Sequence, residues 1–410
     1  MSTLNVDKVD PSTGTALEIG TSGDTITVPS GATFVVAGTT EITGTNNVQR
    51  PNAQPLFING DMQVAQRGTS QSGITNTVGP AYVADRFAWE ENGTMSSVFT
   101  MSQETDVPTG QGFTKSLKLD CTTADTPVTN ERIRIEQKFE GQNLQLLKKG
   151  TASAESTTLA FWVKSNKTGT YIANFTDEDN TRIISKAYTI DVADTWEKKI
   201  INYAGDTTDP FVYDNSTSLV VKWFLCAGAS LQSGTLADTW QDYTNANFCV
   251  GQVNFADSTS NEFFLTGVQL EVGTYTSSTL PPFQFESYGE NLLRCQRYFV
   301  QFGNNQGVAD QGNYGLGITN NDDEGCHILI PLPTTMRTAS STITQSGTAS
   351  DYAVRTTTTD ASTGVPVFAD ATTSNILVKF VNNGHGFGTG VVVRGMTNAD
   401  PSYIGVSAEL

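Results

Sequence analysis

Apolar residues alternate with polar or small ones over short stretches along most of this chain. Leu159, Phe161 and Val163, for example, are separated by single residues, and this i, i+2 spacing points their side chains to one face of a strand. Clusters rich in Gly, Asn and Asp, which favour turns, separate such stretches. The sequence has no long Ala/Glu/Lys/Leu stretches of the kind that favour helices. It therefore predicts a mainly β protein.

Residues 1–54 contain apolar pairs in which one polar residue separates the two members, with turn-forming clusters between the pairs. Short strands of this kind expose an apolar face that one chain cannot bury, so the segment must associate with copies of itself or with another protein. We expect a three-chain β stem, and the alternative for so polar a segment is disorder. The predicted stem core consists of Leu4, Val6, Leu17, Ile19, Ile26, Val28, Phe34 and Val36.

Residues 55–287 contain longer strand patterns with turn signals between them. Many short strands without an intervening helical period predict an antiparallel jelly-roll sandwich. Ser287 and Glu290 have the spacing of a capping box, and Leu292 and Cys295 follow at helical spacing. We therefore expect one short helix over 289–299. Strand patterns return after it, so residues 288–410 are predicted to form this linking helix and a C-terminal β-sandwich.

The length, charge and cysteine content of the chain indicate which ligands it can bind and where it folds. Two or three cores are expected for 410 residues. A formal charge of −18 would repel nucleic acids and anionic membranes. We see neither a secretory signal pattern nor a membrane span, so we expect folding in a cytoplasm. Buried reduced thiols are expected, rather than a zinc site, at Cys121, Cys226, Cys249, Cys295 and Cys326.

Several motifs occur in a fixed order over nearly the whole chain. Those near the start resemble the virion-proximal segment of marine bacteriophage tail fibres, and the later ones resemble the jelly-roll module and last domain of phage tail proteins. The motifs are residues 2–9 (STLNVDKV), 23–32 (GDTITVPSGA), 57–67 (FINGDMQVAQR), 84–87 (ADRF), 266–273 (TGVQLEVG), 293–299 (LRCQRYF), 331–337 (PLPTTMR) and 407–410 (SAEL).

The resemblance implies a homotrimeric virion protein that is mounted on the phage tail by residues 1–54. It also implies that the far end of the fibre binds a glycan or another receptor on the host cell surface. Residues 55–287 would then be a module like those that bind carbohydrates, and residues 288–410 would include the receptor-binding tip. The rival interpretations are a structural tail component that braces other tail proteins and a glycan-degrading tailspike.

Catalytic motifs are not evident in the sequence. The two histidines, His327 and His385, are not accompanied by a recognisable nucleophile, zinc or nucleotide-binding motif. Glycoside cleavage needs only two suitably spaced carboxylates, and Glu136, Asp177 and Asp179 are candidates by residue type alone. Surface or turn positions are the simpler interpretation of these carboxylates. We therefore expect a protein without enzymatic activity.

Sugar binding commonly uses aromatic rings that stack on pyranose faces, with polar side chains beside them. Trp240, Tyr243 and Tyr213 lie in polar stretches, and His385 and Phe387 lie in a glycine-rich loop. These five residues are the predicted glycan contacts, with His385 and Phe387 preferred. The alternative is that the rings anchor their own loops.

We expect no cofactor other than a possible structural calcium ion. Residues 176–180 and 320–325 are rich in oxygen ligands, but both also have the composition of hairpin turns, which we favour. The jelly-roll resemblance implies a structural calcium site near the first and last strands. Asp61 and Glu271 would be its nearest counterparts.

Overall fold

Antiparallel strands account for most of the regular structure of this protein. The computed structural model describes residues 54–77, 79–304, 312–320, 325–357, 359–382, 387–399 and 402–410. The eight predicted stem residues, from Leu4 to Val36, lie outside these ranges. Within the described ranges the chain is mainly β, as predicted, and no helix there is long and apolar enough to cross a membrane.

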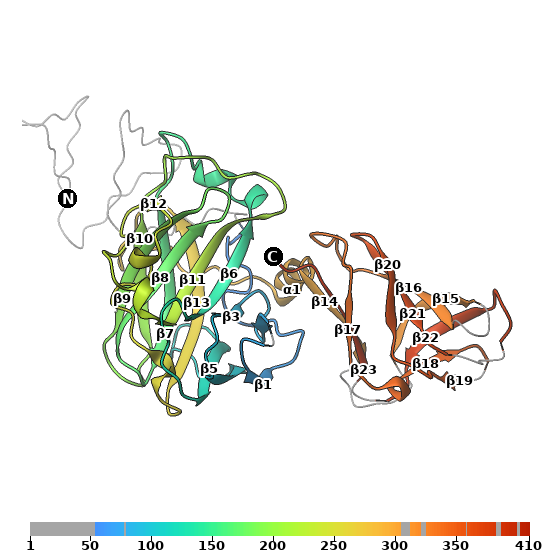
Figure 1. The fold of residues 1–410 in the computed structure, drawn as a ribbon. Helices are drawn as coiled ribbons and strands as arrows, with labels where there is room; N and C mark the ends of the chain where they lie inside the picture. Colours follow the sequence, from blue (N-terminus) through green and yellow to red (C-terminus); the bar gives the residue numbers. More distant parts are fainter. Residues whose placement is uncertain are drawn as a thin grey trace, which may run out of the picture. The chain divides into compact units, whose positions relative to one another are not determined.

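Two sheets that pack face to face form the jelly roll, in which the strands run from blue to yellow in Figure 1. The six-stranded sheet contains, in spatial order, β1 (Ser70–Ile74), β4 (Val98–Glu104), β5 (Ser116–Thr123), β13 (Glu262–Val272), β7 (Thr157–Ser165) and β10 (Glu197–Tyr203). The seven-stranded sheet contains β12 (Gln241–Asp242), β9 (Arg182–Ile190), β8 (Gly169–Asp177), β11 (Thr217–Ala227), β6 (Arg132–Glu140), β3 (Ala88–Asn92) and β2 (Ala81–Tyr82).

The alternation in the sequence explains how these strands build a core. Phe161 and Val163 of β7 point between the two sheets, where they are fully buried. Trp223 of β11 lies at the centre, with its ring centroid 5.8 Å from that of Phe161 and 5.8 Å from that of Phe57. Large aromatic side chains of this kind supply much of the apolar area that a sandwich buries.

One face of β11 is also covered from outside the sandwich. Phe224 points away from the main core and packs in a second cluster with Ile172 of β8 and with Phe248 from the segment 228–254. The Phe224 and Phe248 rings meet edge to face at 5.1 Å. This explains why β11 is apolar on both faces, a pattern that alternation alone does not predict.

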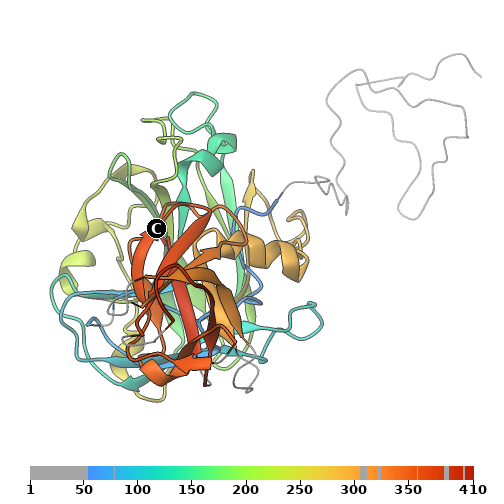
Figure 2. The same cartoon turned by 90° about the vertical axis from the view of Figure 1, so that its right-hand side faces the viewer.

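The single described α-helix, α1 (Tyr288–Gln296), is gold in Figure 2. As predicted, Ser287 caps it, because the Ser287 hydroxyl accepts from the Glu290 amide and donates to the Glu290 carboxylate. The helix ends three residues earlier than we expected. Cys295, near the end of the helix, is buried in a small cluster with Tyr298 and Leu410. All five cysteines of the chain are buried.

The C-terminal residues form two further sheets around their own core. The three-stranded sheet contains β14 (Phe299–Asn304), β23 (Ser402–Ser407) and β17 (Ile343–Gln345). The seven-stranded sheet contains, in order, β19 (Thr359–Ala361), β18 (Tyr352–Arg355), β22 (Val392–Thr397), β15 (Asn313–Thr319), β16 (Cys326–Pro331), β21 (Asn375–Phe380) and β20 (Val367–Ala371). Both are orange to red in Figure 1.

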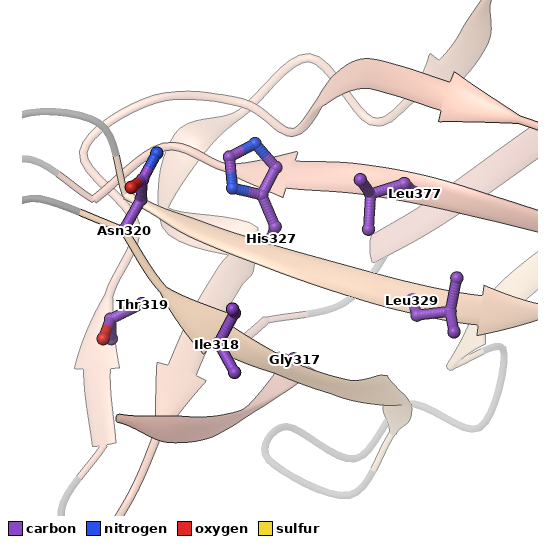
Figure 3. Close-up of a pocket in the computed structure, with 7 residues that line it drawn as sticks. All are labelled: Gly317, Ile318, Thr319, Asn320, His327, Leu329 and Leu377. Atoms are coloured by element: carbon purple, nitrogen blue, oxygen red, sulfur yellow. The ribbon is translucent and has the colours of Figure 1, made fainter. Parts of the chain in front are cut away.

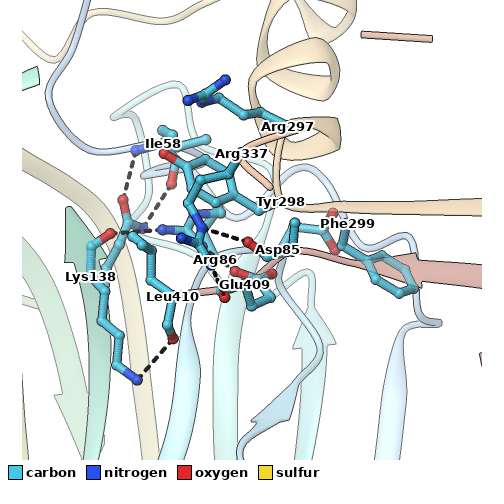
Figure 4. Close-up of polar contacts among 12 residues, drawn as sticks. Ile58, Asp85, Arg86, Lys138, Arg297, Tyr298, Phe299, Arg337, Glu409 and Leu410 are labelled. Carbon is cyan, nitrogen blue, oxygen red and sulfur yellow. Dashed lines mark hydrogen bonds and ion pairs between the residues drawn. The ribbon is translucent and has the colours of Figure 1, made fainter. Parts of the chain in front are cut away.

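Buried ion pairs connect the last residues of the chain to the jelly roll. The Glu409 carboxylate pairs with the buried Arg86 guanidinium and, at 3.1 Å, with Arg67. Arg337 donates to the carbonyl oxygens of Ala408 and Glu409. Lys138 donates to the carbonyl oxygen of Leu410 at 3.0 Å (Figure 4). We call these contacts the junction.

A second ion pair beside the junction fixes the end of α1. Arg297 contacts both carboxylate oxygens of the buried Glu140 at 2.7 Å, and the Tyr298 hydroxyl donates to the same carboxylate. Burial alone would raise the pKa of Glu140, but hydrogen bonds from Arg297 and Tyr298 together lower it. The bidentate geometry restricts the rotation of both side chains.

Replacing Glu409 with Gln should destabilise the protein, because it leaves the Arg86 guanidinium buried without its carboxylate. We expect the free energy of unfolding to fall by about 3–5 kcal/mol in urea denaturation. Glu155→Gln is the matched control, since the Lys148–Glu155 pair is exposed and should contribute less than about 1 kcal/mol. Equal losses in the two variants would contradict this assignment.

Asp85, whose carboxylate lies 3.8 Å from Arg67 at the junction, should make stability depend on pH. Burial raises its pKa to about 6, although Arg67 and Gln66 oppose the shift. A carboxyl group whose pKa is higher in the folded state stabilises the protein at pH values below its pKa in the unfolded chain. This stabilisation is lost as the pH rises through about 6. Between pH 4.5 and 7.5, Asp85→Asn should therefore gain roughly 2 kcal/mol relative to the native chain. A difference that does not change with pH would contradict this.

Candidate functional site

Aromatic residues lie on the outer face of the six-stranded jelly-roll sheet, which the sandwich core does not use. Trp162 of β7 stands between the core residues Phe161 and Val163, so its side chain points to the opposite face and stays half-buried. Phe264 of β13 alternates with the core residues Phe263 and Leu265 in the same way. On this face Phe264 is buried, whereas Trp162 keeps part of its ring exposed on a strand of the sheet.

Trp162 lies beside a packed group of three rings, Phe113, Phe283 and Phe285. We call these four residues the aromatic strip. The Phe113 ring centroid lies 5.1 Å from that of Phe283 and 5.2 Å from that of Phe285. Phe285 leaves 49% of its surface exposed. The strip therefore combines strand β7 with the segment before β5 and the segment after β13.

Gly267 in β13 allows the Phe113 and Trp162 side chains to approach each other closely. Its backbone has a φ of +61°, and a Cβ atom there would lie 2.6 Å from Phe113 Cζ and 3.0 Å from Trp162 Cδ1. The Phe113 and Trp162 rings therefore meet over this glycine. Any other residue would combine a strained backbone with a steric clash.

Charged groups lie beside the strip on the same face. Lys164, two residues after Trp162, places its ammonium 4.2 Å from the Phe264 centroid and pairs with Asp106. The indole nitrogen of Trp196 donates to Asp106 at 2.9 Å. Burial raises the pKa of Asp106, but hydrogen bonds from Lys164 and Trp196 lower it overall. Rings beside an ionised carboxylate and an ammonium are groups that can bind a sugar through both its apolar and its hydroxyl surface.

The outer face of the other jelly-roll sheet is occupied by ion pairs. Glu136 of β6 is 1% exposed and pairs with Arg134 at 2.5 Å and with Lys138 at 3.4 Å. Lys222 of β11 donates to Thr176, and burial lowers the pKa of Lys222 to about 8. The charges on this face therefore neutralise one another.

The three carboxylates considered for glycoside cleavage have structural contacts. Glu136 belongs to the ion pairs just described. Asp177 is buried and lies 2.6 Å from the Lys149 ammonium. Asp179 accepts a hydrogen bond from the Val212 amide at 2.9 Å. Asp177 and Asp179 also belong to the hairpin between β8 and β9, which is the turn expected at 176–180.

The predicted glycan contacts do not come together in the described residues. Trp240 packs against the jelly-roll core and donates to the Ala204 carbonyl, and Tyr243 packs 5.1 Å from Phe248. Both rings anchor their loops, the alternative left open by the sequence. Tyr213 is 44% exposed. Phe387 packs against the C-terminal core.

The remaining predicted site residues are the histidine of the glycine-rich loop and the candidate calcium ligands. His385 and residues 321–324 are outside the described ranges. Asp61 accepts a hydrogen bond from Asn291 at 3.2 Å, whereas Glu271 accepts one from Gln269. No group of three or more His, Cys, Asp or Glu residues that could hold a metal occurs within the described part of the chain.

The C-terminal domain has a hollow of about 450 Å³ on its seven-stranded sheet. Ile318, His327, Leu329 and Leu377 lie along it on three neighbouring strands, and Asn320 lies at one end (Figure 3). His327 is a strand residue, as predicted. The lining is mainly aliphatic, which differs from the aromatic strip on the jelly roll.

The chain is thus a mainly β protein with a jelly roll. No family model and no curated protein matches its sequence. Similar solved structures include the enzymatically active domain of tailspike protein 4 from bacteriophage CBA120, with 14% identity, a TM-score of 0.26, and coverage of 46% of this chain and 19% of that chain. The match therefore spans less than a fifth of the tailspike chain.

Carbohydrate-binding modules are also among the similar structures. A family 4 module has 10% identity and a TM-score of 0.27, with coverage of 52% of this chain and 97% of that chain. A family 11 module of a Clostridium thermocellum cellulase has 8% identity and a TM-score of 0.25, with coverage of 51% and 98%.

Substituting Gly267 with Ala should disturb the aromatic strip. Gly251→Ala is the control, because Gly251 also has a positive φ of +89° but its Cβ would meet nothing closer than 3.9 Å. Both variants should lose about 1 kcal/mol from backbone strain, and Gly267→Ala should lose about 1–3 kcal/mol more from the clash. Thermal unfolding measures both losses, and equal values would contradict the close contact.

Proposed function

We propose that this protein is a homotrimeric phage tail fibre, a structural virion protein that binds glycan on the host cell surface. Residues 1–54 would trimerise and attach to a tail protein, as the motif resemblance implies. The observation that carries the glycan-binding part is the aromatic strip. Trp162 is held on strand β7 and the other three rings pack against one another, so little conformational entropy is lost when a flat pyranose face stacks on them.

The mechanism that we propose is multivalent binding. Trp162 and Phe285 would provide the stacking surface, and Asp106 with Lys164 would hydrogen-bond to sugar hydroxyls. Each site can be weak, because three copies in one fibre raise the effective concentration of every later contact. The loop with His385 and Phe387 is the second predicted contact, in the C-terminal domain.

We propose binding without cleavage. The carboxylates Glu136, Asp177 and Asp179 are held by ion pairs or turn hydrogen bonds, which leaves little freedom for proton transfer to a substrate. The rival tailspike function needs a pair of carboxylates that can reach a glycosidic bond. The other rival, a bracing component of the tail, needs no glycan site at all.

Glycan binding can be tested with an array of purified bacterial surface polysaccharides. Trp162→Ala and Phe285→Ala should each weaken binding to any positive polysaccharide by about tenfold, which corresponds to 1.4 kcal/mol of lost stacking. Tyr288→Ala is the matched control, because it removes a comparably exposed ring from helix α1, outside the aromatic strip and the predicted glycan contacts.

Three results would overturn the proposal. No binding to any polysaccharide on the array would favour the bracing function. Unchanged binding in Trp162→Ala and Phe285→Ala would remove the aromatic strip from the site. Shortened polysaccharide chains after incubation, measured by size-exclusion chromatography, would favour the tailspike function.

A further inference from the structure

The outer face of the seven-stranded C-terminal sheet is aliphatic and exposed. Leu316 and Ile318 of β15 are 60% and 54% exposed, Leu329 of β16 is 50% exposed, and Val392 of β22 is 66% exposed. These strands are neighbours in the sheet, and Leu377 of β21 continues the surface (Figure 3). Contiguous exposed aliphatic side chains of this kind mark an interaction surface rather than ordinary solvent contact. We call these five residues the aliphatic face.

Glycines on the opposite side of the same strands fix this orientation. A Cβ atom at Gly395 would lie 2.8 Å from Ile328 Cγ1 and 3.1 Å from Phe380 Cζ, and both of these residues are buried in the core. Gly315 likewise faces Ile328. A slip of one residue that turned Leu316 inward would place a large side chain where only glycine fits. The exposure of the aliphatic face is therefore built into the packing.

The strand register arranges the face in two rows. One runs from Val392 through Ile318, His327 and Lys379 to Val367. The other ends in opposite charges. Leu316 pairs with Arg394 on one side and with Leu329 on the other, Leu329 pairs with Leu377, and Leu377 pairs with Asp370. Directly opposite residues share one face of a sheet. The row therefore runs from Arg394 through three leucines to Asp370.

Neither terminal charge of this row is neutralised within the described residues. Arg394 and Asp370 are exposed there and have no ion-pair partner in the described ranges. Arg355 of β18 pairs in register with Arg394 and adds a second positive charge to that end. The face thus has Arg394 and Arg355 at one edge, an aliphatic centre, and Asp370 at the other edge, with Lys379 on the same face of β21 as Leu377.

We propose that this face packs against the same face of other copies of this chain. A copy turned about a symmetry axis brings leucine against leucine and the Arg394 edge toward an Asp370 edge, so one surface is complementary to itself. Sheets that pack face to face interdigitate their side chains in this way. This proposal rests on the proposed function in one respect, because the number of copies, three, comes from the proposed homotrimer.

The composition of the aliphatic face favours another copy of this chain over a sugar as its partner. Among its five members there is no aromatic ring for stacking, and the neighbouring His327 is the only ring that lines the hollow. Aliphatic centres with few charges are typical of the interfaces in homo-oligomers. The aromatic strip and the aliphatic face would therefore have different partners.

Cross-linking of the full chain tests the proposal. Leu329→Cys, treated with a short bis-maleimide, should give covalently linked copies on a denaturing gel. Val192→Cys is the matched control, because Val192 is 56% exposed on the jelly roll, and it should give at least tenfold less product. Adding Ile318→Lys to Leu329→Cys should abolish the product, because it places an ammonium in the aliphatic centre.

Two measurements keep this test separate from glycan binding and from misfolding. Ile318→Lys should leave the circular dichroism spectrum and the polysaccharide-array signal unchanged, since within one chain Ile318 is exposed and lies outside the aromatic strip. Cross-linking of Leu329→Cys no greater than that of Val192→Cys would overturn the proposal, as would product that survives Ile318→Lys. If no polysaccharide on the array binds but cross-linking is strong, the glycan-binding proposal is wrong and the self-association proposal stands.

Discussion

Every β-sheet in this protein has two faces, and only one of them can point into a given core. Because side chains alternate along a strand, each sheet must use its second face in some other way. This constraint organises the whole structure. The seven-stranded jelly-roll sheet covers part of its outer face with Phe248 and fills much of the rest with ion pairs around Glu136. The other two large sheets leave part of theirs exposed, at Trp162 in one and at Leu316 and Ile318 in the other.

The two open faces differ in chemistry, and this difference separates the two proposed partners. The six-stranded jelly-roll sheet presents Trp162 and Phe285 beside charged groups, whereas the C-terminal sheet presents Leu316, Ile318 and Val392. Rings with polar neighbours suit a hydroxylated ligand, and aliphatic side chains suit another apolar protein surface. One architectural rule thus provides two surfaces that do not compete for the same partner.

Sequence patterns predicted the strands and the helix better than they predicted the contacts of the side chains on them. The capping pair Ser287 and Glu290 and the mainly β class follow from local rules. The same alternation that predicts strand β7 also places Trp162 opposite Phe161, so the sequence contained a signal for the aromatic strip. Phe113 and Phe285 carry no such signal, because Phe113 comes near Trp162 only over Gly267 and Phe285 packs on Phe113.

The C-terminal sheet shows why faces are harder to predict than strands. Tyr314, Leu316 and Ile318 have the spacing of one face, but an irregularity in the register between Asn313 and Gly315 interrupts the pairing with β22. Tyr314 is buried while Leu316 and Ile318 are exposed. The register depends on distant strands, which a local pattern cannot report.

The junction has a consequence for the order in which the chain folds. Arg67 and Glu409 are separated by 342 positions in the sequence, so a ribosome must complete nearly all of the described chain before the pair can form. The jelly roll can assemble earlier, with Arg86 still hydrated until Glu409 emerges. Contacts between such distant positions are slow to form. Docking of the final residues is then a late step of biosynthesis, after which the guanidinium is enclosed.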